Sequence, residues 1–239
     1  MRRDHRPYYA KRIYRRLEGW YARRRLRPQF DTLGKGAAFF KPWHVEVFGP
    51  RISLGDYATV IAAPDLKVRL CVWPAEADSG EIRIGRYALI CPGVRIGSAV
   101  GVSIADNCMI ASGAYITDSD WHGLYDRVSS GIAAPVAIAE NVWIGDRALI
   151  CKGVSIGRNS VVGAAAVVTR DVPENAVVAG NPAAIVKRLD PDRPMVPRDR
   201  WFADPVGLAR ELDRWDRDIL RGNTTAHWLR NLLFPMRGD

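Results

Sequence analysis

The clearest candidate for chemistry in the sequence is a histidine that lies among carboxylates. The segment 117–131 reads Thr-Asp-Ser-Asp-Trp-His-Gly-Leu-Tyr-Asp-Arg-Val-Ser-Ser-Gly, which places His122 close to Asp118, Asp120 and Asp126. A neutral imidazole can take the proton of a hydroxyl group near neutral pH, and a neighbouring carboxylate can fix its tautomer. We predict that His122 is a general base and that Asp118 and Asp120 orient it or bind an acceptor. The plain alternative is a surface histidine in a polar loop.

Other common kinds of site lack the residues they need. No Gly-x-Gly-x-x-Gly, P-loop or Gly-x-Ser-x-Gly segment occurs, so nucleotide hydrolysis and serine-hydrolase chemistry find no support. Neither His-x-x-x-His nor Cys-x-x-Cys occurs among the histidines and cysteines, which are His5, His44, His122, His227, Cys71, Cys91, Cys108 and Cys151. We therefore expect no metal site, and thiols that stay reduced.

The element that must position the histidine is a repeat with a period of six residues. An aliphatic residue opens each repeat, at Leu54, Val60, Leu66, Val72, Ile84, Ile90, Ile96, Ile104, Ile110, Ile116, Ile138, Ile144, Ile150, Ile156, Val162 and Val168. This period fits neither an amphipathic helix nor an alternating strand. It fits short strands joined by turns, with glycine supplying unusual turn conformations. Three repeats would close a triangular coil, and stacked coils would bury one continuous core.

The repeats also set the organisation of the chain. Between Ile116 and Ile138 they are interrupted, so residues 117–137 are expected to form a loop outside the stack, and such long loops are often functional. We predict three segments, which are a basic helical arm at 1–40, the repeat domain at 41–189, and a C-terminal helical extension at 190–239.

Both end segments show helical apolar stripes. One stripe runs through Tyr9, Ile13, Leu17 and Trp20, and the other through Leu208, Leu212, Trp215 and Ile219. Residues 1–30 hold eleven Arg and Lys against two acidic residues, a net charge of +9 that equals the formal charge of the whole chain.

Three interpretations of the basic arm stay open. Its apolar side could pack on the repeat domain, it could lie on anionic lipid, or it could bind nucleic acid, for which no known module is present. No apolar run is long enough for a membrane-spanning helix, and no secretory signal is visible. We expect a cytoplasmic protein, with possible peripheral contact at the inner membrane face through residues 1–30 and no nucleic-acid partner.

Residues 104–189 resemble the hexapeptide-repeat acyltransferases, whose fold is a left-handed parallel β-helix, and are most similar to the galactoside- and maltose-type sugar O-acetyltransferases. The matching segments are Ile104-Ala-Asp-Asn-Cys-Met-Ile, Asn141-Val-Trp-Ile-Gly, Val167-Val-Thr-Arg-Asp-Val-Pro and Val178-Ala-Gly-Asn-Pro-Ala-Ala-Ile-Val-Lys. The resemblance implies a mainly β fold with helical extensions at both ends. It also implies a homotrimer, because family members place the active site between neighbouring prisms.

The resemblance assigns roles to particular residues. It implies that His122 is the catalytic base, although counting from Asn107 brings the family's histidine onto Trp121, so that one inserted residue must be assumed. It implies that Trp143 lies beside the acceptor and the thioester. The residues that it implies for coenzyme A are Gly145, Ala164, Thr169, Arg170, Asn181 and Lys187, of which Arg170 and Lys187 suit phosphate groups.

The expected function is transfer of an acyl group, chiefly acetyl from acetyl-CoA, to a hydroxyl of a sugar or saccharide. Attack on the thioester would be direct, with backbone amides stabilising the oxyanion. Two alternatives remain. One is a non-catalytic β-helix that serves as a scaffold or membrane-associated assembly subunit, and the other is an N-acyltransferase that acts on an amino sugar.

Overall fold

The structure is a computed structural model that describes residues 3–76 and 79–236. Its contacts divide the chain into two units, residues 21–200 and residues 1–20 together with 201–239, and each unit is described by itself. Residues 1–2 of the predicted arm and 237–239 of the predicted extension lie outside the described residues.

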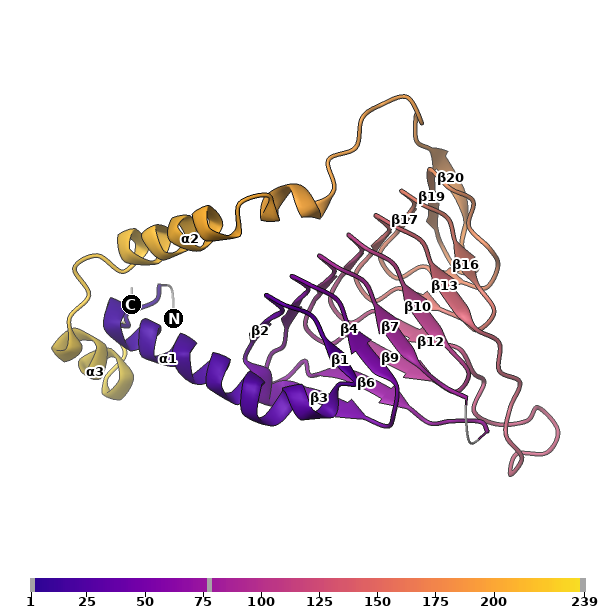
Figure 1. The fold of residues 1–239 in the computed structure, drawn as a ribbon, viewed down its shortest axis with the longest axis horizontal. Helices are drawn as coiled ribbons and strands as arrows, with labels where there is room; N and C mark the ends of the chain where they lie inside the picture. The colour runs from indigo at the N-terminus through magenta and orange to yellow at the C-terminus, as the bar shows by residue number, and fades with distance from the viewer. Residues whose placement is uncertain (1–2, 77–78, 237–239) are drawn as a thin grey trace. The chain divides into compact units, whose positions relative to one another are not determined.

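The described part of unit 21–200 is a stack of coils whose short strands form three faces (Figure 1). The first face holds β1 (Thr32–Leu33), β4 (Ile52–Leu54), β7 (Ile82–Ile84), β10 (Val102–Ile104), β13 (Val136–Ile138) and β16 (Ser155–Ile156). The second face holds β2 (Ala38–Phe40), β5 (Thr59–Ile61), β8 (Leu89–Ile90), β11 (Met109–Ile110), β14 (Trp143–Ile144), β17 (Val161–Val162), β19 (Ala176–Ala179) and β20 (Ala184–Arg188). The third face holds β3 (Val45–Phe48), β6 (Val68–Val72), β9 (Arg95–Ser98), β12 (Tyr115–Thr117), β15 (Leu149–Ile150) and β18 (Val167–Val168).

The six-residue period is what aligns these strands. Neighbouring coils pair in parallel with repeat aliphatics opposite one another, as where Ile104 pairs with Ile84 on one side and Ile138 on the other. Ile144 and Ile150 open the next two repeats on the second and third faces, and both are fully buried. The predicted left-handed parallel β-helix is confirmed, with its core along the axis of the stack.

Glycines after the aliphatic residues serve a purpose other than the predicted one. A Cβ on Gly85 would lie 2.5 Å from the carbonyl carbon of Ala105, and a Cβ on Gly145 would lie 2.6 Å from the amide nitrogen of Ala164. The left-handed backbone falls two residues later, as at Tyr87 and Arg147. These glycines therefore permit close approach of successive coils rather than an unusual turn conformation.

The repeat register shifts in the early coils. Leu66, predicted as an inward repeat residue, is 44 % exposed, and Leu70 is 1 % exposed in its place. Leu70 pairs with Ile96, while the turn before β6 is longer than in later coils. The prediction for Leu66 is wrong because its turn, held by hydrogen bonds between Ala63 and Leu66, bulges out of the stack.

The coils also begin before residue 41. Strands β1 and β2 pair with β4 and β5, because Leu33 and Phe39 have the same six-residue spacing as the later repeats. Three short helical turns flank them, a π-helical turn at Ala22–Leu26 and 3-10 turns at Arg27–Gln29 and Pro42–His44.

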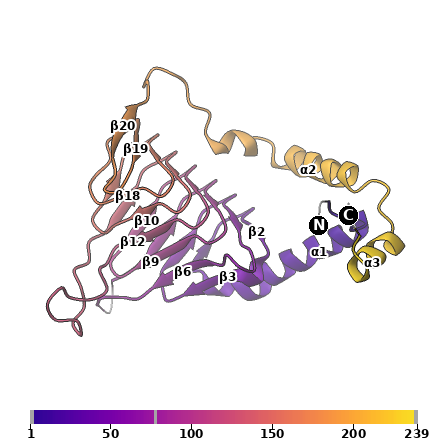
Figure 2. The ribbon, with the colours of Figure 1, turned by 180° about the vertical axis from the view of Figure 1, so that it is seen from behind.

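The longest insertions lie at one corner, between the third face and the first. They follow β6 and β12, and the segment after β12 is the predicted loop, which projects from the stack (Figure 2). At the C-terminal end of the stack, β20 turns back antiparallel to β19. A 3-10 helix at Arg198–Phe202 follows.

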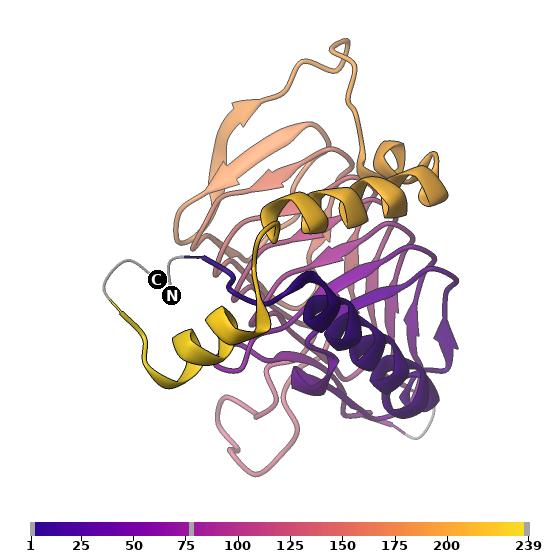
Figure 3. The ribbon, with the colours of Figure 1, turned by 90° about the vertical axis from the view of Figure 1, so that its left-hand side faces the viewer.

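The described part of the other unit consists of helices (Figure 3). They are α1 (Tyr8–Tyr21, whose last residue belongs to unit 21–200), α2 (Pro205–Ile219) and α3 (Thr225–Leu233). The Lys11 ammonium lies 2.6 Å from Asp216, and the Tyr8 hydroxyl donates to Asp213. Because the polar side of α1 packs on α2, its apolar stripe stays exposed.

Candidate functional site

The loop that carries His122 is a hairpin with an ordered base. Asp120 donates its amide to the carbonyl of Ile132 at 3.1 Å, and Gly123 donates to the carbonyl of Ser129 at the same distance. Gly131 passes so close that a Cβ there would lie 2.6 Å from the carbonyl oxygen of His122. The backbone of His122 is thereby fixed between two hydrogen-bonded rungs, below the exposed tip at 124–128.

The imidazole of His122 is exposed beyond this fixed backbone. Within residues 3–76 and 79–236, the structure gives it no hydrogen bond or ion pair. Both ring nitrogens are therefore available to a substrate, which a general base requires.

Asp118 is not brought to His122. Its carboxylate is fully buried and accepts hydrogen bonds from the Ser98 hydroxyl at 2.8 Å and from the amides of Ala99, Val100 and Gly101 at 2.7, 2.9 and 2.6 Å. This arrangement ties the base of the loop to the corner that follows β9. The Asp118 carboxylate therefore stabilises the fold of this corner and is not available to His122.

Asp120 is also occupied, but on the surface. Its carboxylate forms an ion pair with Lys152 of the next coil, at 2.7 Å between the closest atoms. Among the residues that the structure describes, His122 therefore has no carboxylate partner of the kind that the sequence suggested.

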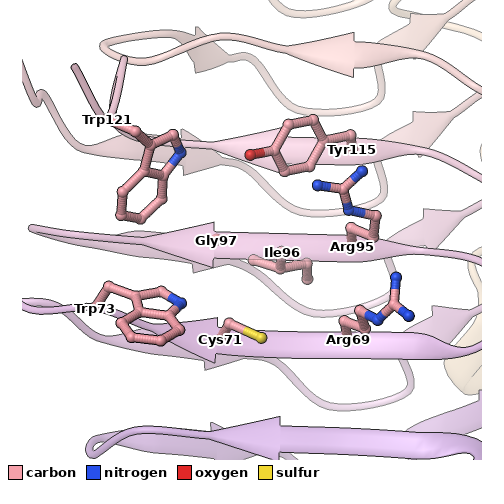
Figure 4. A pocket seen from close by; sticks show the side chains of 8 residues that line it. All are labelled: Arg69, Cys71, Trp73, Arg95, Ile96, Gly97, Tyr115 and Trp121. Atoms are coloured by element: carbon pink, nitrogen blue, oxygen red, sulfur yellow. The ribbon is translucent and has the colours of Figure 1, made fainter. Parts of the chain in front are cut away.

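A pocket on the outer third face adjoins this loop (Figure 4). We call it the corner pocket; it has a volume of about 370 Å³ and is lined by Arg69, Cys71, Trp73, Arg95, Ile96, Gly97, Tyr115 and Trp121. Trp121 adopts a left-handed backbone (φ 64°) and donates its indole N–H to the Thr117 hydroxyl at 3.1 Å. The sequence analysis did not predict this pocket. One signal pointed to it, because counting from Asn107 brings the position of the family's histidine onto Trp121, which lines the pocket.

The residues predicted for coenzyme A lie in the last coils of the stack. Gly145 and Ala164 lie one above the other at the corner between the second and third faces. Thr169 and Arg170 follow β18, and Lys187 lies on β20; all three are exposed.

Asn181 precedes a cis proline in the turn between β19 and β20. This turn covers the edge of β18, since Val167 donates to Gly180 and accepts from Ala183. Trp143, on the outer second face, is 49 % exposed. The structure therefore places Trp143 and His122 on different parts of the prism.

The thiols are poorly suited to be nucleophiles. Burial raises the pKa of Cys108 to about 12, so that this thiol is protonated near neutral pH. Burial also raises the pKa values of Cys71, Cys91 and Cys151. In the described part of the chain, no three or more His, Cys, Asp or Glu side chains are arranged to hold a metal ion.

Two family models match the repeat domain. They are described as the hexapeptide repeat of succinyl-transferase, at residues 82–118, and the bacterial transferase hexapeptide, at residues 135–170. Both segments lie in the stacked coils.

The chain is similar to several known acetyltransferases. The chain is 35 % identical over 112 residues to the galactoside O-acetyltransferase of Escherichia coli, covering 46 % of this chain and 55 % of that protein. A hexapeptide-repeat acetyltransferase of Vibrio cholerae is 24 % identical, with a TM-score of 0.49, covering 77 % of this chain and 93 % of that one. A maltose O-acetyltransferase of Clostridium difficile is 26 % identical, with a TM-score of 0.42, covering 76 % and 85 %.

The chain spans about half the length of the curated relatives it matches. Sequence similarity to them and the matches of both repeat segments agree with the parallel coils of the structure. Over its stacked coils, the chain is therefore similar to hexapeptide-repeat transferases, acetyltransferases among them.

Proposed function

We propose that the protein transfers an acyl group, acetyl above all, from a coenzyme A thioester to a hydroxyl of a saccharide. The observation that carries the proposal is the His122 loop, which holds the backbone of a free imidazole at the corner of a hexapeptide-repeat stack. The similarity to a galactoside O-acetyltransferase supports both the donor and the class of acceptor.

The reaction follows from the properties of the imidazole. His122 accepts the proton of the acceptor hydroxyl as its oxygen attacks the thioester carbonyl. Collapse of the tetrahedral intermediate breaks the carbon–sulfur bond, and the thiolate leaves with a proton returned by the imidazolium. The products are the ester and free coenzyme A, without an acyl-enzyme.

The donor would bind along the last coils. Ala164 is exposed, and its small side chain leaves the backbone there accessible to the pantetheine arm, whereas Gly145 is buried and lets the two coils approach closely. Arg170 and Lys187 are exposed cations that could pair with phosphates of the nucleotide, with Thr169 and Asn181 near the same end. These assignments rest on the family resemblance together with this exposure.

The loop and the donor corner are contributed by different protomers in this proposal. His122 lies at the corner between the third and first faces, whereas Trp143 and Ala164 belong to the second face and its corner with the third. A homotrimer of prisms would bring the loop of one protomer to the second face of its neighbour.

Binding of the donor is the first test. We expect acetyl-CoA and free coenzyme A, but not ATP, to raise the melting temperature in a saturable way. A ligand at a hundred times its dissociation constant adds about 2.7 kcal/mol to the free energy of unfolding. No stabilisation by acetyl-CoA at millimolar concentration would favour the alternative of a non-catalytic scaffold.

Turnover of His122→Ala is the second part of this test. Loss of a general base should lower kcat roughly 10² to 10⁴-fold while thermal unfolding stays unchanged. Leu124→Ala, which changes an exposed residue of the same loop tip, serves as the matched control. Acetyl transfer to an amino sugar rather than to a hydroxyl would support the N-acyltransferase alternative, and near-normal turnover of His122→Ala would remove this base.

We also propose peripheral contact with anionic lipid at the inner face of the cytoplasmic membrane. The exposed apolar stripe of α1, flanked by Arg12 and Arg16, supports this contact. No described helix is long and apolar enough to span a bilayer.

A further inference from the structure

We propose that the corner pocket binds an anionic saccharide, a sugar that carries a carboxylate or phosphate group, and that this sugar is the acyl acceptor. The acceptor role rests on the proposed function, whereas the binding of the anionic sugar can be tested separately.

The shape of the corner pocket suits one sugar ring. Its volume of about 370 Å³ is at the lower end of the range for small-molecule sites. Trp73 and Trp121 stand at one end and the two arginines at the other, with Gly97 and Cys71 between them (Figure 4). A Cβ on Gly97 would lie 3.2 Å from the Trp121 ring, so the absence of a side chain there makes room for the indole against the strand.

The aromatic end is held in place by its surroundings. The indole N–H of Trp121 bonds to Thr117, and the Trp73 ring lies 4.5 Å from the Phe48 ring between centroids. Trp73 is 56 % exposed. The electron-rich face of an indole attracts weakly positive C–H groups, and a sugar ring presents a row of them. Two such indoles at the end of a pocket therefore favour a saccharide.

The other end of the pocket carries an excess of positive charge. Arg69 and Arg95 are paired in register on β6 and β9. Arg69 shares the carboxylate of Glu46 with Lys67, at 2.7 and 2.6 Å respectively. Arg95 lies with its guanidinium carbon 4.4 Å from the centroid of the Tyr115 ring.

Arg95 has no ion-pair partner within the described ranges. Lys67 and Arg69 share the single carboxylate of Glu46, and Arg95 lies next to Arg69 on the neighbouring strand, so positive charge is in excess here. An arginine held on an aromatic ring with its N–H donors unpaired suits a carboxylate or a phosphate, which accepts two parallel hydrogen bonds. We infer that Arg95 selects for the charged group of the sugar.

The pocket lies beside the proposed base. Trp121 lines it and precedes His122 directly, so their Cα atoms are about 3.8 Å apart. A sugar that contacts Trp121 would therefore have its hydroxyls near the backbone that carries His122. This proximity connects the corner pocket with acyl transfer.

Direct binding of matched sugars tests the proposal. Glucuronate, galacturonate, glucose 6-phosphate and galactose 6-phosphate are titrated into the full chain by calorimetry, each against its neutral parent sugar. We expect at least one anionic sugar to bind tenfold or more tightly than its parent. Arg95→Gln should weaken this binding by about tenfold or more, the effect of losing a charge-assisted hydrogen bond.

Two controls locate the effect. Arg83→Gln changes an exposed arginine on β7 of the first face and should keep the preference. At alkaline pH, which is needed because burial raises the pKa of both thiols, the bound sugar should also slow the modification of Cys71 by iodoacetamide, but not that of Cys91, which does not line the pocket. A cooperative thermal unfolding transition in Arg95→Gln and in Arg83→Gln would show that both variants fold.

The proposal is overturned if no anionic sugar binds more tightly than its parent, or if the preference survives in Arg95→Gln. Binding of acetyl-CoA, measured in the same proteins, separates this failure from failure of the proposed function. If acetyl-CoA stabilises both proteins and the sugar preference is absent, the inference about the corner pocket alone is wrong. If the preference is present and acetyl-CoA does not bind, the acceptor role is wrong and the binding site stands.

Discussion

At the scale of single residues, the three carboxylates near His122 have distinct surroundings. Asp118 is buried under four hydrogen bonds, Asp120 pairs with Lys152, and Asp126 accepts a hydrogen bond from the Val128 amide at the loop tip. These aspartates are close to His122 in the sequence, but the structure gives none of them a hydrogen bond to its imidazole. The proposed reaction therefore depends on the position of His122 and on the groups of the substrate that contact its imidazole.

Because Asp118 is buried and hydrogen-bonded, we predict that its replacement lowers the stability of the protein. Asp118→Asn keeps one carbonyl oxygen but loses acceptors for buried donors, so the free energy of unfolding should fall by at least about 2 kcal/mol. Urea unfolding measures the change, and Asp126→Asn, at an exposed position, is the matched control. Unchanged stability together with lost turnover would instead place Asp118 in the chemistry.

At the scale of elements, the turns between strands decide which aliphatic residues are buried. Leu70 occupies the core position that regular spacing gives to Leu66, because the turn before β6 is longer. The same third face carries the residues of the corner pocket on its outer side. A turn insertion therefore changes both the core and the surface of its coil.

The two leucines should respond differently to truncation. Leu70→Ala should lower the free energy of unfolding by about 2–5 kcal/mol, since it leaves a cavity in a packed core. Leu66→Ala, on a side chain that is 44 % exposed, should cost less than about 1 kcal/mol. Chemical denaturation of both variants is the measurement. Equal losses would mean that both residues are buried and that the turn is packed differently.

The helix α1 is the other element with a consequence for function. Its stripe of Tyr9, Ile13, Leu17 and Trp20 is 51–57 % exposed. The polar side chains of α1, by contrast, form ion pairs and hydrogen bonds with α2, such as the ion pair of Lys11 with Asp216. An exposed stripe beside arginines is typical of helices that lie in a lipid interface.

Vesicle binding tests this contact. We expect the protein to cosediment with vesicles of phosphatidylcholine and phosphatidylserine, more weakly at high salt, and not with phosphatidylcholine alone. Leu17→Glu should reduce the bound fraction several-fold, whereas Leu124→Glu, which changes an even more exposed leucine in the loop, should leave it unchanged. Equal binding of both variants would exclude the stripe as the contact.

At the scale of the whole molecule, we propose that two prisms complete the site. His122 and Trp143 project from different corners and faces of the same stack. In the proposed homotrimer, a second copy of the chain would present its second face to this loop.

Complementation between inactive variants checks this arrangement. If His122→Ala and Trp143→Ala are each inactive, chains mixed under dissociating conditions and reassembled should regain activity, because some interfaces then hold both native residues. Mixed trimers should recover on the order of a tenth or more of the native rate, as expected for random assembly. No recovery, with trimers formed, would mean that each chain supplies both residues to its own site.

Much of this molecule was determined by the sequence alone. The period of six fixes the coil, since a residue such as Ile144 can only be buried if every turn returns the chain to the same face. The interruption after Ile116 likewise identified the loop and His122. Both features are local, so they can be recognised without knowing what lies next to them.

The tertiary structure decided which side chains meet across coils. The burial of Asp118 depends on amides about twenty residues earlier, and the corner pocket depends on Arg69, Arg95 and Tyr115 falling into one row on three coils. Turn insertions between those coils set that row, and their lengths follow no period. For that reason the pocket beside His122 could not be read from the sequence, although the histidine itself could.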